Sequence, residues 1–242
     1  MNGALGILGG MGPLATADFF QKVIKATPAA RDQEHIPIFI YSVPQVPDRT
    51  ESILSGKDEP LTWMRKGIET LCRSGAECIA IPCNTAHYWY EKLVDGLDIP
   101  VLHIVDATAA SLASKDINEG PIGLLATTGT ITAEVYQKRF SVLGYECITP
   151  NPDTQINGVT AGIEAVKAGD LDNARRRLEA AANTLVEQNC HAIVLGCTEI
   201  PIVLNSETNH SPRIQYLDAT QSLAEASVRW HLDLPGKKQR II

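Results

Sequence analysis

The sequence predicts an α/β protein built from two similar three-layer domains with mainly parallel sheets. The domains are expected to be related by pseudo-twofold symmetry, with a functional site in the cleft between them. Short, continuously apolar runs alternate with longer segments of helical periodicity along the 242 residues, which is typical of parallel strands covered by helices on both faces. The same landmarks recur in the same order in both halves, and a cysteine follows an equivalent apolar run in each half.

Eight short runs are expected to form the strands. Most of them are rich in Ile, Val and Leu, which suit a strand buried on both faces. The last run has a less regular apolar pattern than the others. In chain order, the runs are Leu5–Leu8, Ile38–Tyr41, Cys78–Ile81, Val101–Ile104, Ile122–Leu125, Glu146–Ile148, Ala192–Leu195 and Ile214–Leu217.

Helices are expected in the segments between these runs, where apolar residues recur every three to four positions. Asp106 and Asp218 each precede such a segment and are interpreted as helix N-caps. In chain order, the expected helices are Ala15–Ala26, Glu59–Arg73, Ala86–Val94, Ala107–Ser114, Thr132–Leu143, Ile156–Lys167, Asp170–Gln188 and Ala219–Trp230.

The two halves share four pairs of similar segments, at spacings that fall slowly from 117 to 112 residues. One apolar match would mean little, but four in the same order indicate a duplicated α/β unit. The pairs are Gly6–Leu8 with Gly123–Leu125, Phe20–Lys22 with Tyr136–Lys138, Leu71–Cys83 with Leu185–Cys197, and Asp106–Thr108 with Asp218–Thr220.

The last pair predicts where the chain passes between domains. If the helix after Asp106 crosses into the second domain, the helix after Asp218 crosses back. The C-terminal helix would then pack on the first domain. The expected domains are residues 1–105 plus 210–242, and residues 106–209.

Composition excludes several classes of function. The net charge is −7 and basic residues form no block, so the chain lacks the positive patch of a nucleic-acid or anionic-membrane binder. No run of about 20 apolar residues could span a membrane. The N-terminus lacks the basic region of a signal peptide, and Gly9 and Gly10 interrupt its apolar run. We therefore expect a cytoplasmic location and neither a nucleic-acid nor a membrane partner.

The six cysteines form neither a C-x-x-C pair nor a zinc-ligand pattern. We expect free thiols and no metal, with most cysteines buried as packing residues. Cys83 and Cys197 differ, because each lies just beyond an apolar strand, where open parallel sheets carry functional groups. Helix-start residues follow both, and helix N-termini are expected to lower the pKa of each thiol and to hold a substrate carboxylate.

The pseudo-twofold would place these two thiols on opposite sides of a shared cleft. A thiolate on one face of a carbon atom can remove its proton while a thiol on the other face delivers one. Donors in a water-poor cleft would stabilise the carbanion that develops. This arrangement predicts racemisation or epimerisation.

Four motifs resemble the aspartate/glutamate racemase family over nearly the whole chain. Ile81–His87 and Leu195–Glu199 are similar to the two cysteine signatures of that family. Gly9–Gly12 and Pro44–Thr50 resemble its aspartate racemase branch. The resemblance implies an isomerase of D-amino acid metabolism that works without pyridoxal phosphate or another cofactor, and commonly a homodimer.

The resemblance also implies roles for individual residues. Cys83 and Cys197 would be the catalytic acid/base pair. Arg49 and Lys167 would bind the substrate's carboxylates, and Met11 would pack beside the site. Asn84, Thr85 and Thr198 would bind the α-carboxylate or the amino group. Thr128 would contact the substrate, and Glu199 would lie close to Cys197.

Simpler interpretations stay open for several of these residues. Arg49 could be a solvated surface charge, and Lys167 could complement a helix dipole. Glu199 could tune Cys197 or simply favour a helix N-terminus, and His87 could orient Cys83 or be structural. Gly10-x-Gly12-x-x-Ala15 fits the dinucleotide fingerprint as written.

No acidic residue ends the second expected strand to bind a ribose. We therefore expect no nucleotide cofactor and interpret these glycines as allowing close approach of a small anionic substrate.

Interconversion of L- and D-aspartate is the function that these observations favour, because two cations suit a dicarboxylic amino acid. A glutamate or broad-specificity amino-acid racemase is an alternative. Maleate isomerisation or malonate decarboxylation on the same scaffold is another, and a non-enzymatic binding module with a closing cleft is a third.

Overall fold

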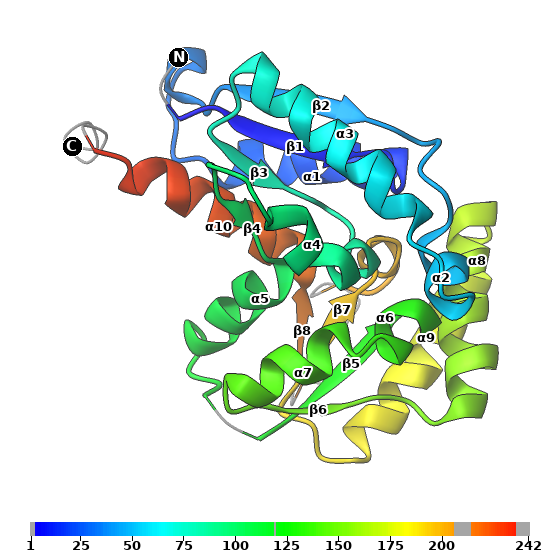
Figure 1. The fold of residues 1–242 in the computed structure, drawn as a ribbon. Helices are drawn as coiled ribbons and strands as arrows, with labels where there is room; N and C mark the ends of the chain where they lie inside the picture. The colour runs from blue at the N-terminus through cyan, green and yellow to red at the C-terminus, as the bar shows by residue number, and fades with distance from the viewer. Residues whose placement is uncertain (1–2, 119, 206–213, 236–242) are drawn as a thin grey trace.

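Two four-stranded sheets, each with all its strands parallel, frame the molecule in the residues that the structure describes, 3–118, 120–205 and 214–235 (Figure 1). The structure is a computed structural model. The strand orders are β2-β1-β3-β4 and β6-β5-β7-β8, equivalent orders that confirm the predicted α/β duplication. The strands are β1 Leu5–Gly9, β2 Ile38–Ser42, β3 Cys78–Ala80, β4 Val101–Leu102, β5 Pro121–Ala126, β6 Glu146–Ile148, β7 Ala192–Gly196 and β8 Gln215–Asp218.

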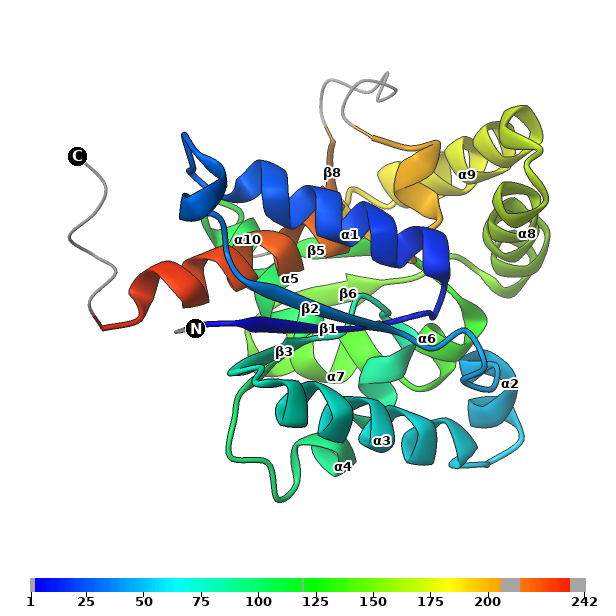
Figure 2. The ribbon, with the colours of Figure 1, turned by 90° about the horizontal axis from the view of Figure 1, so that it is seen from above.

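Helices connect these strands and cover the sheets. In the view from above, α1 and α10 lie over one side of the first sheet, and α3 and α4 lie on the other (Figure 2). The α-helices are α1 Pro13–Ala26, α2 Arg49–Leu54, α3 Glu59–Ser74, α4 Tyr90–Val94, α5 Ile104–Ala113, α6 Thr128–Thr132, α7 Val135–Val142, α8 Ala161–Ala168, α9 Leu171–Val186 and α10 Ala219–Asp233. Short 3-10 helices are η1 Asp32–Glu34, η2 Thr85–Trp89 and η4 Ile200–Ile202, and η3 Thr154–Thr160 is a π-helix.

Several expected elements differ in the structure. The helix expected over 156–167 is divided into the π-helix η3 and α8. The helix expected from Ala107 begins at Ile104, so Asp106 lies in its first turn and is not its N-cap. The strand expected to reach Ile104 ends at Leu102, because His103 caps α5 by accepting a hydrogen bond from the Val105 N–H at 3.1 Å. The helix expected over 132–143 is divided into α6 and α7, since Glu134 takes a left-handed backbone conformation with φ 55°. The helix expected over 86–94 is divided into η2 and α4.

A central apolar cluster joins the two sheets. It contains Leu5 and Ile7 of β1 and Ile122 and Leu124 of β5, together with residues of α1, α5 and α10. Alternate strand residues face the outer helices instead, as the pleat of a strand requires. Leu8 accordingly packs with α3 and α4 residues, and other residues of the second sheet pack with α8 and α9. The two halves therefore share one core and each has an outer core of its own.

The domain division into residues 1–105 plus 210–242 and 106–209 stays a prediction. Within 210–242, α10 packs against α1 and α5, whereas β8 pairs with β7 in the second sheet. Residues 210–213 and 236–242 lie outside the described part of the chain.

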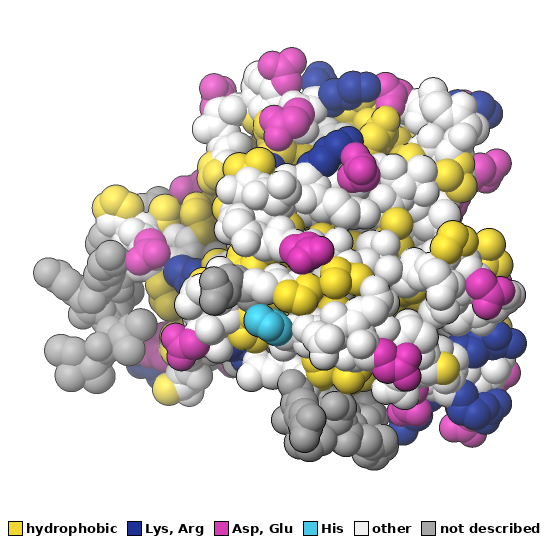
Figure 3. Space-filling view, turned by 90° about the horizontal axis from the view of Figure 1, so that it is seen from below, with side chains coloured by type: hydrophobic (Ala, Val, Ile, Leu, Met, Phe, Trp, Pro, Cys, Tyr) yellow, Lys and Arg dark blue, Asp and Glu magenta, His cyan; other side chains and the backbone are white. Residues whose placement is uncertain are grey.

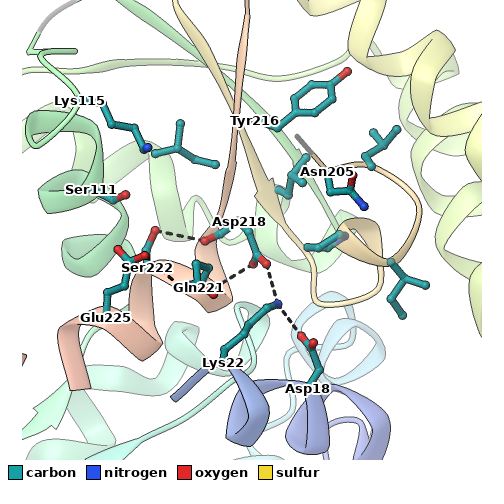
Figure 4. A pocket seen from close by; sticks show the side chains of 15 residues that line it. Asp18, Lys22, Ser111, Lys115, Asn205, Tyr216, Asp218, Gln221, Ser222 and Glu225 are labelled. Carbon is teal, nitrogen blue, oxygen red and sulfur yellow. Dashed lines mark hydrogen bonds and ion pairs between the residues drawn. The ribbon is translucent and has the colours of Figure 1, made fainter. Parts of the chain in front are cut away.

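An ionic link connects α1 to the second sheet. Lys22 Nζ lies 2.5 Å from Asp18 Oδ2 and 2.6 Å from Asp218 Oδ2, at the edge of a cavity of about 430 Å³ (Figure 4). Asp218 also caps α10, accepting hydrogen bonds from the Thr220 and Gln221 N–H groups as its sequence position predicted. This cavity contains no cysteine among its lining residues.

Charged side chains of both signs lie on the surface. Acidic and basic side chains are interspersed on the face seen from below (Figure 3). Among the described residues, none of the helices has both the length and the apolar character needed to cross a membrane.

Candidate active site

A small cavity brings the two singled-out cysteines together. Its volume is about 100 Å³, below the roughly 300–1,000 Å³ of pockets for drug-sized ligands. Cys83 comes from the first half of the chain and Cys197 from the second. The lining residues are Met11, Gly12, Asp48, Arg49, Thr50, Cys83, Asn84, Thr85, Thr127, Lys167, Gly196, Cys197, Thr198 and Glu199.

Each cysteine is positioned by the end of a buried strand. Cys197 directly follows β7, and Cys83 follows β3 after Ile81 and Pro82. The backbone of Cys83 is held further by His87, whose Nδ1 lies 2.9 Å from the Cys83 carbonyl oxygen. His87 Nε2 accepts a hydrogen bond from the Ile104 N–H at 3.2 Å, so Nδ1 carries the ring proton. His87 thus fixes the main chain of Cys83.

The expectation that helix N-termini lower both thiol pKa values is wrong. Burial raises the pKa of Cys83 and raises the pKa of Cys197 well above its ordinary value. Each residue is only 6% exposed, and a thiolate withdrawn from water loses its hydration. The helices that follow, η2 and η4, are short 3-10 segments, so they offer little of the dipole of a regular helix.

The two thiols differ in the charges that face them. After burial, the strongest influence on Cys83 is the Arg49 guanidinium, which acts to lower the pKa of that thiol, and the Ala86 N–H acts in the same direction. For Cys197, the Glu199 carboxylate adds to burial in raising the pKa, and the Glu199 N–H and then Lys167 act to lower it.

Glu199 contacts Cys197 directly. The Cys197 thiol donates a hydrogen bond to Glu199 Oε2 at 3.0 Å. The Thr198 hydroxyl donates to the same oxygen, also at 3.0 Å. These contacts favour the interpretation that Glu199 tunes Cys197 over a role limited to a helix N-terminus.

Two buried hydrogen-bond donors in the cavity lining have no partner among the described residues, Arg49 Nε and Asn84 Nδ2. Arg49 is fixed by Nη1, which donates to the carbonyl oxygens of Val46 and Pro47, both at 3.1 Å. Asn84 is fixed by its oxygen, which accepts from the Tyr136 hydroxyl at 2.7 Å. Because buried donors are rarely left unpaired, both suit an incoming acceptor such as a carboxylate.

Hydroxyl groups join the two halves beside the cavity. Thr85 Oγ1 lies 3.0 Å from Thr127 Oγ1 and 2.9 Å from Thr130 Oγ1. Thr128, expected to contact substrate, does not line the cavity. Thr127 caps α6, so Thr128 becomes its first residue and its hydroxyl lies 3.2 Å from that of Thr160.

The other expected residues all line the cavity: Met11, Arg49, Asn84, Thr85, Lys167, Thr198 and Glu199. The lining also includes residues that the sequence interpretation missed, Asp48, Thr50, Thr127 and Gly196. Three of them could have been found as sequence neighbours of predicted residues, since Asp48 and Thr50 flank Arg49 and Thr127 precedes Thr128.

The role expected for the first glycines needs a correction at Gly10. Its φ of +93° and its backbone contact with Val43, where an added Cβ would lie 2.3 Å from the amide nitrogen, account for glycine at this position. Gly12 does line the cavity, as expected.

The remaining cysteines do not line this cavity. Burial raises the pKa of both Cys78 and Cys147 to about 12. Among the described residues, no group of three His, Cys, Asp or Glu side chains is arranged to hold a metal ion.

The chain is similar to known racemases over nearly its whole length. The model of the family described as Asp/Glu/hydantoin racemase matches residues 8–227. The broad specificity amino-acid racemase RacX of Bacillus subtilis (strain 168) is 32% identical over 238 residues, which cover 94% of this chain and 98% of that protein.

Solved structures give the same picture of the fold. The aspartate racemase of Picrophilus torridus superposes with a TM-score of 0.80 at 30% identity and covers 94% of each chain. The glutamate racemase isoform RacE1 of Bacillus anthracis has a TM-score of 0.67 at 18% identity, over 98% of this chain and 84% of that one. At this low identity, the similarity to RacE1 concerns the fold alone.

Proposed function

We propose, from the premise that this chain belongs to the Asp/Glu/hydantoin racemase family, that it interconverts L- and D-aspartate with Cys83 and Cys197 as its two bases. Membership of the family supports a racemase, in agreement with the cysteine motifs. The observation that carries the proposal is the shared cavity of about 100 Å³, which is lined by one cysteine from each half of the chain.

In the proposed reaction, one cysteine thiolate removes the α-proton of the substrate. A new S–H bond forms, and the electron pair of the Cα–H bond stays on the substrate as a carbanion delocalised into its carboxylate. The other thiol gives its proton to the opposite face of the carbon, and its S–H electron pair stays on sulfur. The unpaired donors Arg49 Nε and Asn84 Nδ2 support this step, because preorganised donors in a buried site stabilise developing negative charge.

Aspartate is the proposed substrate because two cationic side chains, Arg49 and Lys167, line the small cavity. A dicarboxylic amino acid presents two carboxylates, and a guanidinium can bind a carboxylate with two hydrogen bonds. The modest volume favours a short side chain. The remaining proposed binding residues are Met11, Asn84, Thr85, Thr198 and Glu199, with Thr128 as a support next to Thr127.

The test is incubation of pure L-aspartate with the purified protein, after dialysis to remove small cofactors, followed by chiral chromatography. We expect D-aspartate to accumulate until the two enantiomers are equal. In deuterium oxide, the recovered amino acid should carry deuterium at the α-carbon, which neither maleate isomerisation nor simple binding would produce. Absence of D-aspartate, or a requirement for added pyridoxal phosphate, would contradict the proposal.

Broad specificity is a second candidate, favoured by the 32% identity to an amino-acid racemase whose name describes that property. A panel of L-amino acids that includes glutamate separates the two candidates. Comparable rates for neutral and acidic amino acids would favour the second, because neutral side chains would not use both cations.

A homodimer in the cytoplasm also remains a proposal, carried over from the family resemblance. Light scattering after size-exclusion chromatography would measure the mass in solution against the 26.2 kDa of one chain.

A further inference from the structure

We infer that the two thiols are unequal before any substrate binds: Cys83 is the one that gives up its proton first, and Cys197 keeps its proton in a hydrogen bond to Glu199. The inference rests on the proposed two-thiol reaction and assigns each cysteine its starting role. It makes Glu199 a positioning residue that acts on the substrate through Cys197.

The contact between Cys197 and Glu199 requires a proton on one of the two groups. The sulfur lies 3.0 Å from Glu199 Oε2, and that oxygen already accepts a hydrogen bond from Thr198. An ionised carboxylate has no proton to donate, so the sulfur is the donor. A thiolate in this place would instead face a second negative charge in a buried site, where repulsion is stronger than in water.

Cys83 has the opposite surroundings. The charged groups that act on it are the Arg49 guanidinium, which favours the thiolate, and Glu199, whose smaller influence opposes it. On Cys197 the order is reversed, since Glu199 outweighs Lys167. The remaining carboxylate of the cavity lining, Asp48, is turned to the helix start, where it accepts a hydrogen bond from the Glu51 N–H at 2.8 Å.

Burial acts on both thiols, because each cysteine is 6% exposed and both line the same cavity. Loss of hydration therefore disfavours both thiolates. The inequality comes from the cation beside Cys83 and the anion beside Cys197, and a single thiolate in the site forms where the cation stands.

This starting state predicts that the two enantiomers behave differently. The enantiomer whose α-hydrogen faces Cys83 reacts with the Cys83 thiolate form of the protein, which is more abundant than the Cys197 thiolate form. Turnover leaves Cys83 as the thiol and Cys197 as the thiolate, and a proton must pass through solvent from the first to the second to restore the starting state. The other enantiomer binds only the rare form, so its apparent affinity falls by the fraction of that form.

The first experiment measures each thiol without substrate. The intact protein is treated briefly with iodoacetamide over a range of pH, and peptide mass spectrometry follows the alkylation of Cys83 and Cys197 separately. Because only a thiolate reacts, each rate rises with pH around a midpoint. The midpoint does not depend on how easily the reagent reaches either sulfur.

We expect a lower midpoint for Cys83 than for Cys197. At a pH between the two midpoints, the alkylation rate of each cysteine is expressed as a fraction of its own maximum rate at high pH. This fraction should be at least about tenfold larger for Cys83. Glu199→Gln should lower the midpoint of Cys197, because it removes the facing negative charge. Glu187→Gln, the same change at an exposed residue at the end of α9, should leave both midpoints in place. Equal midpoints, a lower midpoint for Cys197, or an unchanged Cys197 midpoint in Glu199→Gln would overturn the inference.

The second experiment uses the proposed reaction. The equilibrium constant of racemisation is unity, so kcat/KM is the same for both enantiomers. We expect one enantiomer to have both the lower KM and the lower kcat, and Glu199→Gln to bring the two KM values together. Equal KM values in the unmodified protein would contradict the inference. Alkylation needs no substrate, so it tests the inequality of the two thiols even if the protein does not racemise aspartate. Failure of the proposed function and failure of this inference can therefore be told apart.

Discussion

Cys83 and Cys197 are the residues on which the chemistry depends, and each should be indispensable. We expect Cys83→Ala and Cys197→Ala each to lower the rate of racemisation by about 10²–10⁴-fold, the usual contribution of a positioned acid or base. The measurement is D-aspartate formed from L-aspartate, with circular dichroism to check folding. Cys72→Ala, a change at a partly buried cysteine on α3, should retain the rate. Normal racemisation by either active-site variant would refute the assignment.

For individual residues, the sequence could predict which side chains line the cavity, but it could not predict the direction of the thiol pKa shifts. Arg49, Asn84 and Lys167 were named from motifs, and all of them line the cavity. The direction of the thiol pKa shifts was mispredicted, because burial depends on the two halves closing over the sulfur atoms. Thr127 was missed in favour of Thr128 because one residue decides which threonine caps α6.

Among the elements, the approach of α2 to α6 positions Arg49 over the cavity. Gly129 in α6 permits this approach, since an added Cβ would lie 2.8 Å from Thr50 Cα in the backbone of α2. We expect Gly129→Ala to push α2 away, to raise KM for aspartate more than it lowers kcat, and to lower the free energy of unfolding by about 1–3 kcal/mol, as overpacking does.

The matched control is Thr132→Ala, which adds no bulk and changes an exposed position of the same helix. It should leave both KM and stability close to those of the unmodified protein. An unchanged KM in Gly129→Ala would mean that the contact between α2 and α6 does not position Arg49.

The elements themselves were predictable to different degrees. The central strands follow from continuous apolar runs, which need no tertiary information. Helix α2 was not expected, although Asp48 caps it through the Glu51 N–H, because six residues in a Pro-rich loop show too little periodicity. The division between α6 and α7 was equally hidden, since it depends on the left-handed conformation of Glu134.

For the whole molecule, the repeat in the sequence predicted equivalent sheets but not the core they share. Periodicity shows that Ile7 and Leu124 are apolar, yet only the folded chain shows that both belong to one central cluster. The site lies where the halves meet, so its geometry depends on that cluster and on links such as Lys22 with Asp218.

His87 should make the stability of the whole molecule depend on pH. It joins the Cys83 carbonyl to the start of α5, a helix that packs against both α7 and α10. Burial is the main cause that lowers the pKa of His87 from 6.5 to about 4. Between these values, the unfolded chain takes up a proton that the folded protein does not, so acid favours unfolding.

We therefore expect the free energy of unfolding contributed by His87 to be fully present above about pH 6.5. It should fall by up to about 3 kcal/mol as the pH drops to about 4, at 1.36 kcal/mol for each tenfold step. Denaturant titrations from pH 8 to pH 4 would measure this change.

His87→Gln keeps a side chain able to donate and accept hydrogen bonds but does not titrate. It should lower stability at pH 8 and flatten the fall with acid, because the titration of His87 itself is removed. Parallel curves for the two proteins would show that His87 does not stay neutral in the folded state.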